Sequence, residues 1–249
     1  MSIDPQMIQP WMLPLLLVYC RIQGCMLAMP GFSERLLPAR IKIALAMVLS
    51  PLFSIGHAAP PAPTPFALAG LAMAEVVTGL LIGGLVRLIA FALPIAATAI
   101  ATTASLSQIL GVANEFSPHP IGNILHLAGL ALLMALGFPV MVCELIGESL
   151  VLKPLGGWPQ AGAVLPAAIA LTARSFLLAM LLASPFILGG LLFQGLSGVV
   201  SKVMPSLPIV FIGAPAAILL ALAALAILTP AILSVWAEAV MQFTLPDLR

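Results

Sequence analysis

Charged side chains are scarce in this sequence: its 249 residues include nine Lys and Arg and eight Asp and Glu, while 62% of the residues are hydrophobic. Charged residues make up 7% of the chain, against about 25% in an ordinary soluble domain. Because so few charges cannot cover a globule in water, lipid or other apolar protein must surround most of the chain. The net charge of +1 also excludes the basic face that binding to nucleic acid requires.

A long hydrophilic stretch is missing as well. Its absence excludes a separate soluble catalytic or regulatory domain and predicts one membrane-embedded domain, residues 1–249. Cysteine is limited to three residues without a CxxC spacing, so a disulfide framework is not expected. The first residues lack the basic segment that precedes a cleaved signal sequence. The first apolar run is therefore expected to remain as a structural helix.

One set of residues has the types that bind metal ions. Glu115, His119 and His126 are spaced so that an unbroken helix would bring them towards one face. Pro118 and Pro120 disfavour that helix, and no Cys or Asp lies nearby. No metal ion, other cofactor or catalytic residue set is therefore predicted.

Long apolar runs dominate what remains. A spanning helix needs about 20 mainly apolar residues, and the sequence predicts an all-α membrane protein with about six to seven hydrophobic segments. These segments are expected at residues 11–29, 41–55, 66–86, 88–108, 123–148, 166–200 and 208–240. The third and fourth are expected as two helices or as one bent rod. Residues 57–65, rich in proline, and 153–162 are expected to form a loop and a turn.

Two runs near the C-terminus, residues 175–201 and 203–237, contain no charge at all. As a straight helix the second would measure about 52 Å, while the hydrocarbon core of a bilayer is about 30 Å thick. Either prolines 208, 215 and 230 bend this run, or neighbouring protein surrounds part of it.

Four charges gather in a short island formed by Glu34, Arg35, Arg40 and Lys42. Cations near the ends of spanning helices favour the cytoplasmic side, so residues 31–42 are expected there, with the proline-rich loop across the membrane. The later single cations do not all fall on one side in any simple threading of six or seven spans.

Several charges lie within or at the ends of apolar segments: Arg21, Glu75, Arg87, Glu144 and Arg174. Charges inside a membrane are costly and are expected to pair. Glu144 and Glu148 would repel one another on one helix unless a cation, such as Arg21 or Arg174, lies between them. Structural ion pairs are the simpler interpretation, and a proton relay stays open.

Two glycine patterns permit more than one interpretation. Gly79 and Gly83 form a GxxxG pattern, which suits close packing either within the chain or between subunits. Gly195 to Gly198 resembles a GxSG serine-protease motif, but all three histidines precede Ser197, whereas that chemistry needs a later one. Close helix contact is therefore favoured there. Residues 105–122 are semi-polar and form either a solvent loop or irregular backbone enclosed by protein.

The order of several motifs resembles the FliR family, the flagellar export-gate subunit, and more distantly the SctT subunits of virulence type III secretion. The matching stretches are Pro-Gly-Phe-Ser-Glu-Arg at 30–35, Pro-Ala-Arg-Ile-Lys at 38–42, Ala-Met-Val-Leu-Ser-Pro at 46–51, 111–121, 195–205 and 208–215. Their order and spacing cover nearly the whole chain. The residues before Trp11 and after Trp236 carry little of the resemblance.

The resemblance implies a non-enzymatic subunit, built of tilted and kinked helical hairpins, in a helical export gate. Its partners would be FliP-like and FliQ-like subunits, an FlhB-like subunit, unfolded flagellar proteins and membrane lipid. Its place would be the bacterial inner membrane at the flagellar basal body. Such a gate stands partly above the bilayer, which would explain the over-long charge-free runs and the scattered cations.

The resemblance also implies a pore plug. The cations of the charged island are expected to serve assembly, through subunit contacts or anionic headgroups near the base of the gate. The plug residues would be Gln108, Ile109, Leu110, Gly111, Val112, Ala113, Asn114, Glu115 and Phe116. An equivalent subunit of a virulence secretion system is the alternative of the same architecture. A solute transporter is a third hypothesis, but no internal repeat of the expected kind is visible.

Overall fold

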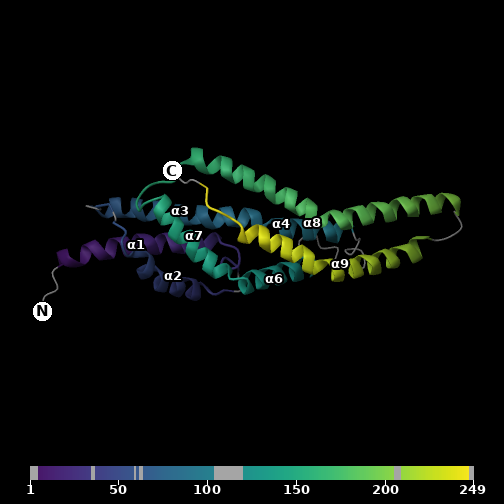
Figure 1. The fold of residues 1–249 in the computed structure, drawn as a ribbon, viewed down its shortest axis with the longest axis horizontal. Coiled ribbons are helices and arrows are strands. Elements are labelled where there is room, and N and C mark those ends of the chain that lie inside the picture. The colour runs from purple at the N-terminus through teal and green to yellow at the C-terminus, as the bar shows by residue number, and fades with distance from the viewer. Residues whose placement is uncertain are drawn as a thin grey trace. The chain divides into compact units, whose positions relative to one another are not determined.

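The computed structural model describes residues 5–34, 37–58, 60–61, 64–103, 120–204 and 209–246. Every regular element in these ranges is an α-helix, so the predicted all-α fold is confirmed (Figure 1). The helices are α1 (Pro5–Ala28), α2 (Ala39–Ser54), α3 (Pro65–Ala90), α4 (Ala92–Thr103), α6 (Pro120–Ala135), α7 (Phe138–Leu152), α8 (Ala161–Val203) and α9 (Ile209–Met241).

Four helical stretches within these ranges are long and apolar enough to cross a membrane. They are Trp11–Ala28, Pro65–Thr102, Ala161–Val203 and Pro215–Met241. Helices α6 and α7 make a fifth if the broken pair counts as one span. The chain is therefore a multi-pass membrane protein. The stretch Pro65–Thr102 includes both α3 and α4, so the two segments expected in this region are present as two helices.

Contacts divide the chain into two compact units. Unit 1 consists of Met1–Ile89, Gly137–Thr172 and Gln242–Arg249, and unit 2 consists of Ala90–Leu136 and Ala173–Met241. Each unit is thus assembled from segments far apart in the sequence. A single functional domain over residues 1–249 stays a prediction.

Within unit 1, glycines allow α1 and α3 to approach with almost no space between their backbones. A Cβ atom added to Gly79 would overlap the α1 backbone at Arg21 and Cys25, and one on Gly83 would lie 2.8 Å from the Met29 nitrogen. The GxxxG pattern therefore serves packing within the chain. Gly84, beside it, has open space around its Cα.

The core of unit 1 closes where the loop after α1 meets the start of α7. The rings of Phe32 and Phe138 stack with centroids 6.4 Å apart, and Phe138 is fully buried. The sequence prediction of one helix over residues 123–148 is wrong at this point. The chain leaves α6 at Ala135, turns at Gly137 with φ 89°, and restarts with Pro139 in the first turn of α7. Proline fits that position because its missing N–H is not needed there.

Unit 2 has its own core, built from α4, α6 and α9. Trp236 of α9 is buried and its indole Nε1 donates a hydrogen bond to the Ala90 backbone oxygen at 3.1 Å. In a regular helix that oxygen would accept from the amide of residue 94, but Pro94 has no N–H and its ring crowds the same carbonyl. The indole therefore satisfies the oxygen freed at the α3–α4 break. The ring packs over Gly129 of α6, where a Cβ would lie 2.8 Å from the indole.

Helices α8 and α9 run in opposite directions and are joined through Met204 (Figure 1). Helix α8 has 43 residues and α9 has 33, with Pro215 and Pro230 accommodated inside α9. At about 1.5 Å per residue α8 measures about 64 Å, roughly twice a hydrocarbon core. The charge-free run 203–237, expected to be over-long as one straight helix, instead begins at the last residue of α8 and continues in α9 from Ile209.

Candidate functional site

Arg21 of α1 and Glu75 of α3 form an ion pair in the core of unit 1. Arg21 Nε lies 2.6 Å from Glu75 Oε2, and neither side chain has any exposed surface. A lone charge in apolar surroundings is costly, and a partner at hydrogen-bonding distance offsets much of that cost. Of the charges flagged within apolar segments, these two are the ones that the structure buries and pairs.

Three further residues complete what we call the buried polar cluster: Arg21, Glu75, Ser149, Lys153 and Gly156. Arg21 Nη1 donates to the Ser149 backbone oxygen at 2.9 Å, and Ser149 Oγ lies 3.3 Å away. The Gly156 amide donates to Glu75 Oε1 at 2.6 Å. Both carboxylate oxygens are therefore occupied. The cluster ties α1, α3, the end of α7 and the connection after α7 into one unit.

Gly156 belongs in this connection for a steric reason. Its φ of 91° lies in the left-handed region that glycine adopts freely. A Cβ there would also lie 2.5 Å from Pro60 Cγ and 3.0 Å from Leu71 Cδ2. The proline-rich loop and the start of α3 therefore pack against the turn at Gly156. The backbone N–H of that turn donates a hydrogen bond to Glu75.

Lys153 follows α7 directly and keeps 6% of its surface exposed. Burial lowers the pKa of its ammonium group below the ordinary 10.5; Arg21 lowers it further, and Glu75 opposes both effects. Arg21 Nη2, also buried, has no hydrogen-bond partner within the described residues. Two cations therefore share one carboxylate, and the cluster carries an excess of positive charge.

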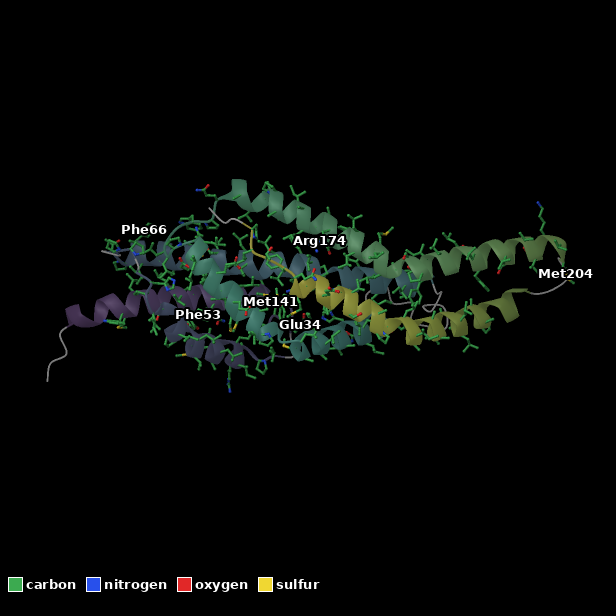
Figure 2. The ribbon with its side chains drawn as sticks, viewed as in Figure 1. Glu34, Phe53, Phe66, Met141, Arg174 and Met204 are labelled. Carbon is green, nitrogen blue, oxygen red and sulfur yellow. The ribbon has the colours of Figure 1, made fainter. Side chains whose placement is uncertain are left out.

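The charged island has a local structural part. Lys42 of α2 is buried and its Nζ donates to the Glu34 backbone oxygen at 3.3 Å. Arg87, half-buried near the end of α3, donates to Ser33 Oγ at 2.9 Å. Both bonds hold the loop after α1, where Figure 2 labels Glu34. Arg40 is exposed, and Arg35 lies outside the described residues.

Other flagged residues are placed differently from the expectation of burial. Glu144 and Glu148 lie on the exposed face of α7, because Met141, Leu145 and Ser149 occupy its inner face. Arg174, labelled in Figure 2 on α8, is exposed as well. The expected cation between the two glutamates is therefore not Arg21, whose Nε bonds Glu75 instead. The proposed plug, residues 108–116, lies outside the described residues.

The most extensive feature of unit 2 is an uncovered apolar surface on α8 and α9. Figure 2 shows side chains projecting along α8 between Arg174 and Met204. The large apolar side chains exposed on the two helices within unit 2 are Phe176, Leu177, Met180, Leu181, Leu188, Leu191, Leu192, Leu196, Val199, Val200, Val203, Leu219, Leu220, Leu222, Ile227 and Val235. Exposed apolar side chains in this number require lipid or protein to cover them.

Polar groups of the buried polar cluster are engaged in structural hydrogen bonds. No group of three or more His, Cys, Asp and Glu that could hold a metal ion occurs in the described part of the chain. Glu75 is committed to two hydrogen bonds and is enclosed. The buried polar cluster is thus a structural tie with spare positive charge.

Sequence reasoning missed three members of the cluster. Lys153 is one of the scattered single cations, Gly156 lies in the turn predicted for residues 153–162, and no pattern marks Ser149. A lysine at the end of an apolar helix is common at a membrane interface, so the sequence carries no signal that this one is buried.

Comparison with known proteins agrees with the helical membrane architecture. Residues 12–243 match the family described as bacterial export proteins, family 1. The chain is 30% identical over 229 residues to the flagellar biosynthetic protein FliR of Caulobacter vibrioides (strain ATCC 19089 / CIP 103742 / CB 15), a match that covers 89% of this chain and 90% of that protein. Both matches span nearly the whole length, including both compact units, and so the chain belongs to the FliR family of bacterial export proteins.

Proposed function

We propose that this protein is a subunit of the flagellar type III export gate. With FliP-like and FliQ-like subunits it would form the channel through which unfolded flagellar proteins cross the inner membrane, with an FlhB-like subunit nearby. Membership of the FliR family supports the export role. The uncovered apolar surface of α8 and α9 is the observation that supports assembly with other subunits.

The length of α8 argues that protein covers part of that surface. The part of α8 from residue 175 to 201 measures about 40 Å and exceeds a hydrocarbon core of about 30 Å, even allowing for moderate tilt. Residues 175–201 of this helix carry no charge, so the part beyond the bilayer would expose apolar side chains to water. Helices of neighbouring subunits in a larger assembly would cover these apolar side chains.

Glycines on α8 fit the same interpretation. Gly189, Gly195 and Gly198 have no other atom of the described residues within 4 Å of an added Cβ. In α3 the glycines Gly79 and Gly83 are already in contact with α1. Small residues left open on a long apolar helix allow another helix to approach closely.

The gate needs a closure, and we assign it to residues 108–116 on the basis of the family resemblance. A semi-polar segment between apolar helices can block ions and then move aside for an exported chain. Deleting these residues should make the inner membrane permeable to small ions in cells that assemble the complex. Unchanged permeability in an assembled complex would refute the assignment of these residues as a plug.

The charged island divides into an inner and an outer part. Lys42 is engaged with the Glu34 backbone, whereas Arg40 is exposed. We assign contacts with partner subunits or anionic headgroups to Arg35 and Arg40. Reversing these two charges should reduce assembly of the gate more than reversing Lys202, which is exposed on α8. Normal assembly of the charge-reversal variant would limit the role of the charged island to holding the loop after α1.

The class of function is tested by co-purification after extraction in mild detergent. Recovery of FliP-like and FliQ-like subunits with this chain is expected, and recovery of the chain alone would contradict the proposal. A null strain should lack filaments and motility, while a fully flagellated null strain would sink the flagellar assignment. The relative named as a flagellar protein favours the flagellar system over a virulence system.

A further inference from the structure

The buried polar cluster has an excess of positive charge that no described residue balances. Glu75 uses one oxygen for Arg21 and the other for the Gly156 amide. Lys153 lies close enough for Arg21 to act on it electrostatically, and Arg21 Nη2 has no partner in the described part of the chain. A buried positive charge without a counterion is costly, so this place suits an anion.

Gly157 brings the buried cluster close to the surface. Lys153 keeps 6% of its surface exposed, and its ammonium lies beside the exposed Gly157, where an added Cβ would come 3.3 Å from Lys153 Nζ. A larger residue at position 157 would therefore crowd the lysine nitrogen on that side.

The residues around Gly157 indicate which anion would fit. Trp158, next in the chain, is 58% exposed, and Val151 and Leu165 on either side of the connection are exposed apolar residues. An exposed tryptophan beside a lysine at the end of an apolar helix is typical of the membrane–water interface. Residues 153–165 contain no Asp or Glu. An anion with apolar chains attached matches this mixture better than a water-soluble anion or an acidic side chain.

We propose that Lys153, backed by the Arg21 guanidinium, binds the phosphate group of an anionic phospholipid beside Gly157. The phosphate supplies the missing negative charge, and the acyl chains lie on the apolar residues beside the connection. This site is independent of the export role, since it concerns lipid and unit 1 alone. Basic pockets between helices recognise lipid headgroups in the same way.

The test uses the full-length chain, purified in neutral detergent and freed of lipid. Phosphatidylglycerol is titrated into it in mixed micelles, and binding is followed by the rise in apparent Tm. Phosphatidylcholine and inorganic phosphate are titrated in parallel. The expected result is stabilisation by phosphatidylglycerol without a matching effect of the other two. Equal stabilisation by phosphatidylcholine, or full stabilisation by inorganic phosphate alone, would overturn the proposal.

Variants locate the site. Lys153→Gln should weaken phosphatidylglycerol binding by about tenfold or more, since one charge-assisted hydrogen bond is lost, and Lys153→Arg should keep it. Gly157→Val should block binding without changing any charge. Lys202→Gln and Gly162→Val are matched controls on α8, because Lys202 is exposed and Gly162 has open space around it. Wild-type affinity in Gly157→Val or in Lys153→Gln would refute the site.

Discussion

Replacing Gly79 by alanine is the most direct test of how unit 1 is built. The added methyl group would overlap the backbone of α1, with the Cys25 nitrogen 2.7 Å and the Arg21 carbonyl carbon 3.0 Å away. Backbone atoms cannot rotate aside as a flexible side chain can. The substitution must therefore push α1 and α3 apart or strain one of them.

The expected cost follows from the overpacking of other cores. Extra methyl groups forced into tightly packed sites typically cost about 1–3 kcal/mol. Separating α1 from α3 would also stretch the Arg21–Glu75 pair, which adds to the upper end. For a chain of this size 1 kcal/mol moves Tm by about 2–4 °C, so a fall of about 2–12 °C is expected.

The matched control is Gly84→Ala in the same helix. Gly84 has no other atom of the described residues within 4 Å of its added Cβ, and alanine in a helix interior is about 0.5–1 kcal/mol more favourable than glycine. Its apparent Tm should stay level or rise. Thermal unfolding of both purified variants in the same detergent measures the difference. Equal Tm values for the two variants would refute the close α1–α3 contact.

Three further predictions concern the charges of unit 1. Glu75→Gln should lower the free energy of unfolding by about 3–5 kcal/mol, because it leaves a buried guanidinium without its counterion. The control Glu144→Gln, on the exposed face of α7, should change the free energy of unfolding by about 0.5 kcal/mol or less. Equal effects of the two substitutions would contradict the ion pair. Ser33→Ala removes the acceptor of Arg87 Nη1 and should cost about 1 kcal/mol in chemical denaturation, so an unchanged midpoint would remove that bond. Because folding lowers the pKa of Lys153, the unfolded chain binds more protons than the folded chain at pH values between the folded-state and unfolded-state pKa. The stability of lipid-free protein should therefore rise as pH approaches 10.5. Lys153→Met should abolish this rise, and a fall in wild-type stability over that range would contradict the prediction.

The helices were largely predictable because apolar runs longer than a bilayer span leave few other folds. Segment ends were less so, as the break at Gly137 shows: residues 123–148 are apolar throughout, and only Gly137 and Pro139 mark the interruption. Pro215 and Pro230 stand inside α9 without ending it. Proline alone therefore does not decide where a helix in apolar surroundings stops.

The partners of the buried charges could not be predicted from the sequence, for a different reason. Arg21 was flagged, but Glu144 and Glu148 competed with Glu75 as candidate partners, and sequence distance does not rank them. The choice depends on Gly79 and Gly83, which bring α3 against α1 and so place Glu75 beside Arg21. The connection after α7 then donates the backbone N–H of Gly156 to Glu75. No pattern of side chains in the sequence reveals that hydrogen bond.

The bond from Trp236 to the Ala90 oxygen has a consequence for how family members diverge. The indole makes up for the amide that Pro94 lacks, so the two positions, far apart in the chain, share one task. A relative with an ordinary residue in place of Pro94 would supply that amide locally and would have no need of a hydrogen-bond donor at the place of Trp236. Substitutions at these two positions should therefore appear together in evolution, with Gly129 enlarging only where the indole has been lost.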